Sequence, residues 1–284
     1  MANPLKYAVH VHTFGDYAHV PRLVALAREA EAAGWDGFFV TDHLTARGRS
    51  GPAPIADPWI ALAAVASATR RVRIGPMVAA LPRRRPWQVA SEAVTLDHLS
   101  GGRLVLGVGS GTLDERNFLP FGEEPDLPTR GRMLDEALTV LAGLWSGRPF
   151  SHQGEHYRVH EVTFLPQPLQ SPRIPIWVAG TWPHRRPFRR AARWDGAMPI
   201  FTYPKTSAVP VADFADVVEF LRGERGDLAG FDIALEGTTT AVDAEKTIEP
   251  YAAAGLTWWV EAFGWWRGGV ADARARIAAG PPGA

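Results

Sequence analysis

Apolar and polar residues follow two alternating patterns along the chain. Short apolar runs rich in β-branched and aromatic residues are followed by longer segments whose apolar residues recur at helical spacing. The first such pair is the run 5–11 and the segment 21–33, which ends before Gly34, a typical C-terminal cap. This pair predicts a strand followed by a helix that packs on it.

The same unit repeats along the whole chain. We predict strands at 5–11, 37–40, 72–78, 103–108, 176–179, 196–200, 231–237 and 257–262. We predict helices at 21–33, 58–68, 86–99, 130–145, 188–194, 211–222, 244–254 and 270–278. Strands separated by helices pair in parallel through right-handed crossovers, and eight of them close naturally into a barrel. We therefore predict an α/β fold, a (β/α)₈ TIM barrel, with an open doubly wound sheet as the alternative.

The longest segment without a barrel element is 146–175, between the fourth helix and the fifth strand. It contains Gly154-Glu155-His156-Tyr157 and a group of prolines. Excursions of this length usually carry function or a hairpin of their own, so we predict a small β insertion here. The chain has 284 residues, a length that one barrel can use fully. We expect residues 1–284 to form a single domain.

Composition excludes several classes of function. The 30 basic and 30 acidic side chains cancel, which removes the positive field that nucleic-acid binding needs. The chain has no cysteine, so disulfides, thiolate catalysis and cysteine metal sites are excluded. The sequence shows neither a signal peptide nor a long apolar run, which predicts a cytoplasmic protein without a membrane partner.

Candidate reactive residues lie where the predicted strands end, because barrel enzymes place their chemistry there. His10 and His12 share one face of the first strand, and each could be structural or functional. Asp42 and His43 follow the second strand. His43 could exchange a proton near neutral pH, whereas Asp42 points to the other side and could orient backbone instead.

Glycines stand at the ends of the third, fourth and fifth strands. The segment 75–78, Gly-Pro-Met-Val, predicts a bulge, because proline cannot donate to the strand ladder. Gly109, Ser110 and Gly111 would let a flat ring or a phosphate approach the backbone, although this is not a dinucleotide fingerprint. Residues 179–181 are followed by Arg185 and Arg186, which predicts a phosphate site or a solvated basic helix start.

These segments together resemble the bacterial luciferase-like superfamily of flavin-dependent monooxygenases and deazaflavin-dependent dehydrogenases and reductases. The matching stretches include Gly-Trp-Asp-Gly-Phe-Phe-Val-Thr-Asp-His at 34–43, Thr-Leu-Asp-His-Leu-Ser-Gly-Gly-Arg at 95–103 and Ile-Pro-Ile-Trp-Val-Ala-Gly at 174–180. In this order the stretches extend nearly from end to end of the chain. The resemblance implies a (β/α)₈ barrel that binds a flavin or deazaflavin.

The resemblance also implies roles for individual residues. It places the ring against the third and fourth strands, the phosphate after the fifth strand, and a catalytic histidine at His43. It maps the non-prolyl cis peptide bond that the family often carries to Met77–Val78. The residues that we expect to bind the cofactor are His12, Met77, Val78, Gly109, Ser110, Tyr157, Ala179, Gly180, Thr181 and Arg185.

Three positions depart from the patterns within this superfamily. Thr112 stands where the sugar-phosphate dehydrogenases have a glutamate, and Arg47 stands where they have a tryptophan. These departures disfavour sugar-phosphate oxidation. Ser110 stands where the luciferase pattern has an arginine, which disfavours light emission on an aldehyde.

The function expected is that of a monooxygenase that uses reduced FMN and O₂ on a small organic substrate. A separate flavin reductase and a homodimer are the partners that we expect. The alternative is hydride transfer by the deazaflavin coenzyme F420. Two further alternatives are a non-catalytic flavin-binding protein and a metal-dependent hydrolase that uses His10, His12, Asp42 and His43. We expect no metal site, because no histidine on the sixth or seventh strand completes such a ligand set.

Overall fold

The computed structural model describes residues 5–48, 51–111, 115–203 and 208–282. Within this part, parallel strands form a barrel whose hydrogen-bonded order is β5-β2-β1-β13-β12-β11-β10-β7-β6. The barrel strands are β1 (Lys6–Val11), β2 (Gly37–Val40), β5 (Arg73–Pro76), β6 (Ala79–Ala80), β7 (Leu106–Gly109), β10 (Ile176–Thr181), β11 (Gly196–Ile200), β12 (Asp232–Gly237) and β13 (Trp258–Phe263).

The third strand of the barrel consists of two pieces, β5 and β6, and both pair with the fourth. Ile74 N donates to Arg103 O at 3.1 Å, and Val105 N donates to Ile74 O at 2.9 Å. Further along, Ala79 lies in parallel register with Val108. The sheet is therefore closed on itself, and the prediction of a (β/α)₈ barrel is confirmed.

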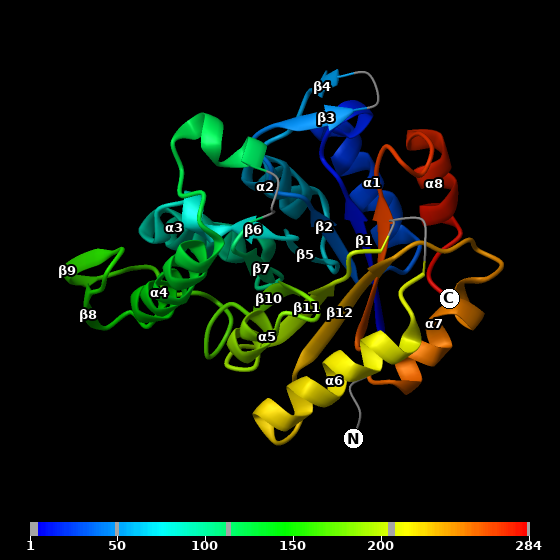
Figure 1. Ribbon diagram of the computed structural model, residues 1–284. Coiled ribbons are helices and arrows are strands. Elements are labelled where there is room, and N and C mark those ends of the chain that lie inside the picture. Colours follow the sequence, from blue (N-terminus) through cyan, green and yellow to red (C-terminus); the bar gives the residue numbers. More distant parts are fainter. Residues whose placement is uncertain (1–4, 49–50, 112–114, 204–207, 283–284) are drawn as a thin grey trace.

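Helices follow the strands and form the outer layer (Figure 1). They are α1 (Val20–Ala32), α2 (Pro58–Ala68), α3 (Pro86–Ser100), α4 (Leu127–Trp145), α5 (Arg185–Ala191), α6 (Val211–Arg225), α7 (Ala244–Ala253) and α8 (Val270–Ala278). Side-chain hydrogen bonds cap the first turns of two of these helices. The carboxylates of Asp57 and Asp126 accept the free N–H groups of Ile60 and Thr129 at the starts of α2 and α4. None of the helices in the described ranges is long and apolar enough to span a bilayer.

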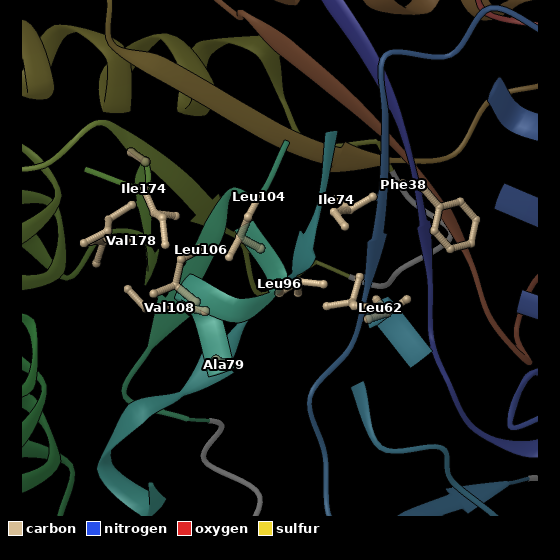
Figure 2. Packing of buried hydrophobic residues seen from close by; sticks show 14 of the residues in the cluster. Phe38, Leu62, Ile74, Ala79, Leu96, Leu104, Leu106, Val108, Ile174 and Val178 are labelled. Carbon is tan, nitrogen blue, oxygen red and sulfur yellow. The ribbon is translucent and has the colours of Figure 1, made fainter. Parts of the chain in front are cut away.

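Apolar side chains pack in two separate clusters. The larger cluster lies between the strands and the helices, and Figure 2 shows the part around Phe38, Ile74 and Leu106. The smaller cluster fills the inside of the barrel and includes Phe39 and Trp258. Successive residues of a strand point to opposite faces, so a strand such as β1 contributes Val9 to the larger cluster and Ala8 to the smaller one.

Two hairpins extend from the barrel. The first, β3 (Ala46–Gly48) with β4 (Gly51–Ala53), follows β2 and was not predicted. The second, β8 (Pro149–Gln153) with β9 (Arg158–Thr163), lies beside α4 and confirms the predicted insertion.

Hydrogen bonds fasten the β8–β9 hairpin at both of its ends. The carboxylate of Glu136 on α4 accepts the backbone N–H groups of Glu155, His156 and Tyr157 in the turn. At the base, Gln167 Nε2 donates to Ser146 O at 2.6 Å. The chain therefore leaves and re-enters the barrel layer at neighbouring points.

Candidate active site

The lower part of the barrel interior is filled by aromatic side chains. Phe39, Trp177 and Trp258 come from three different strands and are almost completely buried. The ring centroids of Trp177 and Trp258 are 5.2 Å apart, and those of Phe39 and Trp177 are 5.5 Å apart. Ala8 and Ala234 complete this layer. Nothing in this layer can exchange a proton with a substrate, so it forms an apolar floor. We refer to the upper part of the barrel interior above this floor as the chamber.

A polar layer follows two residues further along the same strands. His10 Nδ1 lies 2.7 Å from Glu236 Oε2, and His10 Nε2 lies 3.1 Å from Thr41 Oγ1. The other carboxylate oxygen of Glu236 lies 3.8 Å from His12 Nε2. His10 and His12 are both buried, with 1% and 8% of their surface exposed. One carboxylate from β12 thus faces the imidazole of His10 on β1 and that of His12 directly after β1.

The opposite wall of the chamber has very small side chains. A Cβ on Gly107 would come within 2.4 Å of Pro76 O, so only glycine permits the close approach of β5 and β7. A Cβ on Gly109 would lie 3.1 Å from Val78 Cγ2 and 3.7 Å from Ala179 Cβ. Val78, Gly109 and Ala179 therefore line one continuous, low wall. The third strand is interrupted between Pro76 and Ala79, where we expected a bulge within one strand, and the Met77–Val78 peptide bond is cis as expected.

His43 stands at the rim, where β2 ends. Its ring stacks on Phe14, with 6.4 Å between the ring centroids. Phe14 also contacts the edge of His12 at 5.7 Å, and Trp266 contacts His12 at 4.5 Å. Phe14 thus joins His43 at the rim to the polar layer below.

The backbone on both sides of His43 is held by neighbouring loops. Before it, the buried carboxylate of Asp42 accepts hydrogen bonds from Arg83 at 2.6 Å and Arg84 at 2.8 Å. After it, Asn117 Oδ1 accepts the N–H groups of Leu44 and Thr45. The expectation that Asp42 orients its surroundings is consistent with these contacts. They hold the loop that carries His43 in one place.

Asp42 faces two cations that respond differently to burial. Burial lowers the pKa of Arg83, and the contact with Asp42 only partly opposes this. Burial also acts on Arg84, but its hydrogen bond and charge interaction with Asp42 outweigh it and raise its pKa. Guanidinium groups remain charged at neutral pH in either case. The Asp42 carboxylate is therefore fully compensated, and Asp42 is not free to bind a metal as the hydrolase hypothesis requires.

The residues expected at the phosphate point in different directions. A Cβ on Gly180 would lie 2.4 Å from Pro187 Cβ, so Gly180 faces α5 and not the chamber. Thr181 is the next residue of β10 and faces the interior with Ala179. The guanidinium of Arg185 lies over the rings of Trp182 and Phe220, at 5.0 and 4.8 Å. Gly180 could contact a phosphate through its backbone alone. Arg185 would have to move away from these rings to bind the same phosphate.

Tyr157 lies apart from the polar layer, in the turn of the β8–β9 hairpin. It is buried and lines a cavity of about 340 Å³ together with Arg83, Arg85 and Met133. Burial raises the pKa of Tyr157 to about 12, so its phenol is neutral at physiological pH. Arg83, which lines this cavity, also forms the ion pair with Asp42. A role of Tyr157 in cofactor binding stays a prediction.

Sequence reasoning missed several residues of this site. Glu236 is near the end of the seventh barrel strand, a position that could have drawn attention to it. Arg83, Arg84 and Asn117 lie in segments that follow the third and fourth strands, and no local pattern connects them to His43. Thr112, which the sequence comparison within the superfamily singled out, lies outside the described residues.

The comparison with protein families decides the affiliation of the chain. The family described as luciferase-like monooxygenase matches residues 6–276. The chain belongs to this family. The match covers every strand of the barrel and all of its helices except the last two residues of α8. The resemblance seen in the sequence is confirmed.

Relatives of this chain include an F420-dependent dehydrogenase and a monooxygenase. An F420-dependent glucose-6-phosphate dehydrogenase of Microbacterium testaceum is 36% identical over 157 residues, which are 54% of this chain and 45% of that protein. The 4-hydroxyprotoasukamycin monooxygenase of Streptomyces nodosus subsp. asukaensis is 34% identical over 198 residues, which are 68% of this chain and 50% of that protein. The chain thus spans about half the length of these curated relatives.

Solved structures show the same fold. An F420-dependent secondary alcohol dehydrogenase superposes with a TM-score of 0.78 at 20% identity and covers 97% of this chain and 99% of its own. A monooxygenase from Streptomyces bottropensis gives a TM-score of 0.76 at 19% identity, with 96% of each chain covered. Both F420-dependent and monooxygenase members of this family therefore share the barrel described above.

Proposed function

We propose that this protein is a flavin-dependent oxidoreductase, a monooxygenase that uses reduced FMN and O₂ on a small organic substrate. The observation that carries the proposal is the contrast between the two walls of the chamber. One wall, made by Val78, Gly109 and Ala179, has almost no side chains. The other presents His10, His12 and Glu236. A flat heteroaromatic ring needs the first wall, and the chemistry of a substrate beside it needs the second.

The residues near the low wall would hold the cofactor. Met77 and Val78 lie at the break in the third strand, where a ring can rest on backbone. Ser110 follows β7 and Thr181 ends the adjacent strand β10, where hydroxyl and backbone groups can bind a phosphate. When bound, reduced FMN would supply the electrons that activate oxygen. The barrel supplies the position of the ring.

His43 is the proton-handling residue in this proposal. It stands at the rim of the chamber, and the imidazole ring can gain or lose a proton near neutral pH. The contacts of Asp42 and Asn117 fix its loop before any ligand arrives. A fixed loop keeps a general acid or base within reach of the reacting atom. This positioning accounts for a large part of the rate enhancement that such a group provides.

Aromatic side chains beside the polar layer would restrict water. Phe14 and Trp266 both contact the ring of His12. A chamber with little water protects reactive oxygen intermediates from hydrolysis and strengthens every charge interaction inside it. This arrangement suits oxygen activation.

Hydride transfer by coenzyme F420 is the second candidate. It is supported by the relatives named F420-dependent glucose-6-phosphate dehydrogenase, which reach 37% identity over 164 residues in Beutenbergia cavernae. In that reaction His43 would give or take the proton that accompanies the hydride. Arg47, which stands where the sugar-phosphate enzymes of the superfamily have a tryptophan, is exposed on β3. This candidate therefore keeps the cofactor of those enzymes but takes a different substrate.

The partners in this proposal follow from the two-component chemistry. Reduced FMN would come from a separate reductase, as the name "oxygenase component" indicates for the trigonelline monooxygenase of Acinetobacter baylyi, 29% identical over 168 residues. A small organic molecule would be the substrate. We further propose that the protein works as a homodimer.

Cofactor titration tests the proposal. We expect the purified protein to bind one equivalent of FMN or of F420, measured by fluorescence, and the tighter of the two identifies the reaction class. Gly109→Val should reduce that affinity about tenfold or more, because its side chain would occupy the space against the low wall. The control is Gly223→Val on the exposed face of α6, where a Cβ meets nothing within 4 Å.

Thermal unfolding of both variants must accompany the titration, since a Cβ at Gly109 also comes close to Val78. A folded Gly109→Val protein with unchanged affinity would remove the proposed ring position. Failure of the wild-type protein to bind either cofactor would remove the proposed function.

A further inference from the structure

We propose that His10, His12 and Glu236 form a binding site for a divalent transition-metal ion at the bottom of the chamber. The class of ion is one that accepts imidazole and carboxylate together, with Zn²⁺ as the representative. This goes beyond the proposed function and does not depend on it. The hydrolase alternative considered His10 and His12 as ligands together with Asp42 and His43, whereas the carboxylate that the structure places beside the two histidines is Glu236.

The donor atoms converge as a metal site requires. One donor atom from each of the three side chains lies within 4.8 Å of the other two. The carboxylate of Glu236 is 2.7 Å from His10 Nδ1 and 3.8 Å from His12 Nε2. Donors held about 2.1 Å from one ion stand roughly 3.0–3.4 Å apart, and the two observed separations lie on either side of this range. Small side-chain rotations would therefore bring all three into coordination.

Rigid elements hold the three donors. His10 pairs in register with Phe39 of β2 and Ala262 of β13, and Glu236 pairs with Val260 on the other side of β13. His10 and Glu236 thus stand on strands of one closed sheet. His12 is the first residue after β1, and its backbone N–H donates to Phe263 O of β13 at 2.9 Å. Sites on such elements keep their geometry better than sites on loops.

An outer partner already orients His10. Its Nε2 lies 3.1 Å from Thr41 Oγ1, and the carbonyl of Thr41 accepts a hydrogen bond from Thr13 Oγ1 at 3.1 Å. Histidines that bind metals almost always use their second ring nitrogen in this way, because that contact fixes both the ring and its tautomer. Thr41 leaves Nδ1 of His10 directed at Glu236.

The three side chains are not enclosed completely, since the side chain of Glu236 is 20% exposed. The aromatic floor of Phe39, Trp177 and Trp258 closes the site from below. Three protein ligands with open positions are typical of catalytic zinc and of two-histidine, one-carboxylate iron sites. The open positions would face the chamber and take an oxygen ligand, either water or an oxygen of the substrate. Mg²⁺ and Ca²⁺ are disfavoured because they prefer oxygen donors throughout.

A second cluster in the same protein shows why spacing alone is not enough. Glu136, Glu155 and His156 also bring their donor atoms together. There, however, the Glu136 carboxylate already accepts three backbone N–H groups of the hairpin turn, and Glu155 is exposed. That cluster is a structural contact on the surface, so we expect no tight site from it.

Zn²⁺ titration of the metal-free and cofactor-free protein tests the proposal. We expect isothermal calorimetry to show one tight equivalent, and Co²⁺ to give the visible absorption of a low-coordinate site. His12→Ala and Glu236→Gln should each abolish the tight equivalent. His160→Ala, an exposed histidine on β9, should leave it unchanged, as should His156→Ala in the second cluster.

Unfolding curves separate loss of a ligand from loss of the fold, and Glu236→Gln keeps the shape of the side chain. Absence of a tight equivalent in the wild-type protein, or its persistence in a folded His12→Ala variant, would overturn the proposal. FMN and F420 titrations of the same variants give an independent reading. A metal site without cofactor binding, or the reverse, therefore shows which of the two proposals fails.

Discussion

The lower and upper halves of the barrel interior are built by the same strands but differ in the size and the polarity of their side chains. In the lower half, Trp177 and Trp258 fill the space with buried aromatic surface. In the upper half, two residues further along, His10 and Glu236 face an inner wall of glycine and alanine. β1 passes from Ala8 to His10 as it crosses from one half to the other, and His12 follows directly after its end.

This difference shows how one scaffold separates stability from chemistry. Side chains at the lower end pack against one another and leave no room, which is what a core requires. Side chains at the upper end leave space and satisfy their polar groups with each other, which is what a site requires. Substitutions in the two halves should therefore produce different losses.

The largest effect is expected from Trp258→Ala in the lower half. The change removes a buried indole from the aromatic floor and should lower the free energy of unfolding by about 3–5 kcal/mol. Chemical denaturation measures this loss, and Trp265→Ala, at a position 45% exposed, should stay within about 0.5 kcal/mol. Equal losses at the two positions would contradict the distinction between floor and rim.

His43→Ala should reduce turnover and leave the stability of the fold nearly unchanged. The loss of a general acid or base should reduce kcat by about 10²–10⁴-fold, while cofactor affinity and the unfolding midpoint change little. His19→Ala, an exposed histidine before α1, is the matched control. Full activity of the variant, or loss of cofactor binding instead, would show that His43 is not the proton-handling residue.

The smallest effect is expected at Asp232, a carboxylate at the lower end of β12. Burial raises the pKa of Asp232 above its value in the unfolded chain. A carboxyl group of this kind favours the folded state while protonated, and that contribution is lost as the pH rises through its folded pKa. Asp232→Asn should therefore stabilise the protein at neutral pH but not in acid.

Unfolding midpoints at acidic and neutral pH measure this difference. Asp216→Asn on the exposed face of α6 provides the comparison and should show no gain at either pH. If Asp232→Asn destabilised the protein at neutral pH, the ionised carboxylate would be stabilising the folded state, contrary to this prediction.

The course of the barrel could be predicted from the sequence because each unit carries its own local signal. α2 begins at Pro58 and ends at Ala68, as the apolar spacing and the preceding Asp57 indicate. The third strand was predicted as one piece with a bulge, whereas it consists of two, because its pairing depends on β7 and not on its own residues. The β3–β4 hairpin was missed because its strands are short and half exposed.

The site was only partly predictable, for a related reason. His12 and His43 stand at the ends of strands and could be identified locally. Glu236 and Asn117 become relevant only when the barrel closes and brings distant strand ends together. The direction of Gly180 depends on where α5 packs, and no pattern within β10 reveals it.

The joined base of the β8–β9 hairpin has a consequence for how this fold can vary. Gln167, near the end of the segment that carries the hairpin, is hydrogen-bonded to Ser146 at its beginning. The two ends of this segment therefore lie side by side where they join the barrel. Residues can be added to or removed from its far end without moving either attachment point. Tyr157 lies at that end and lines the cavity behind Arg83, so changes in hairpin length would reshape this cavity while the chamber floor stays as it is.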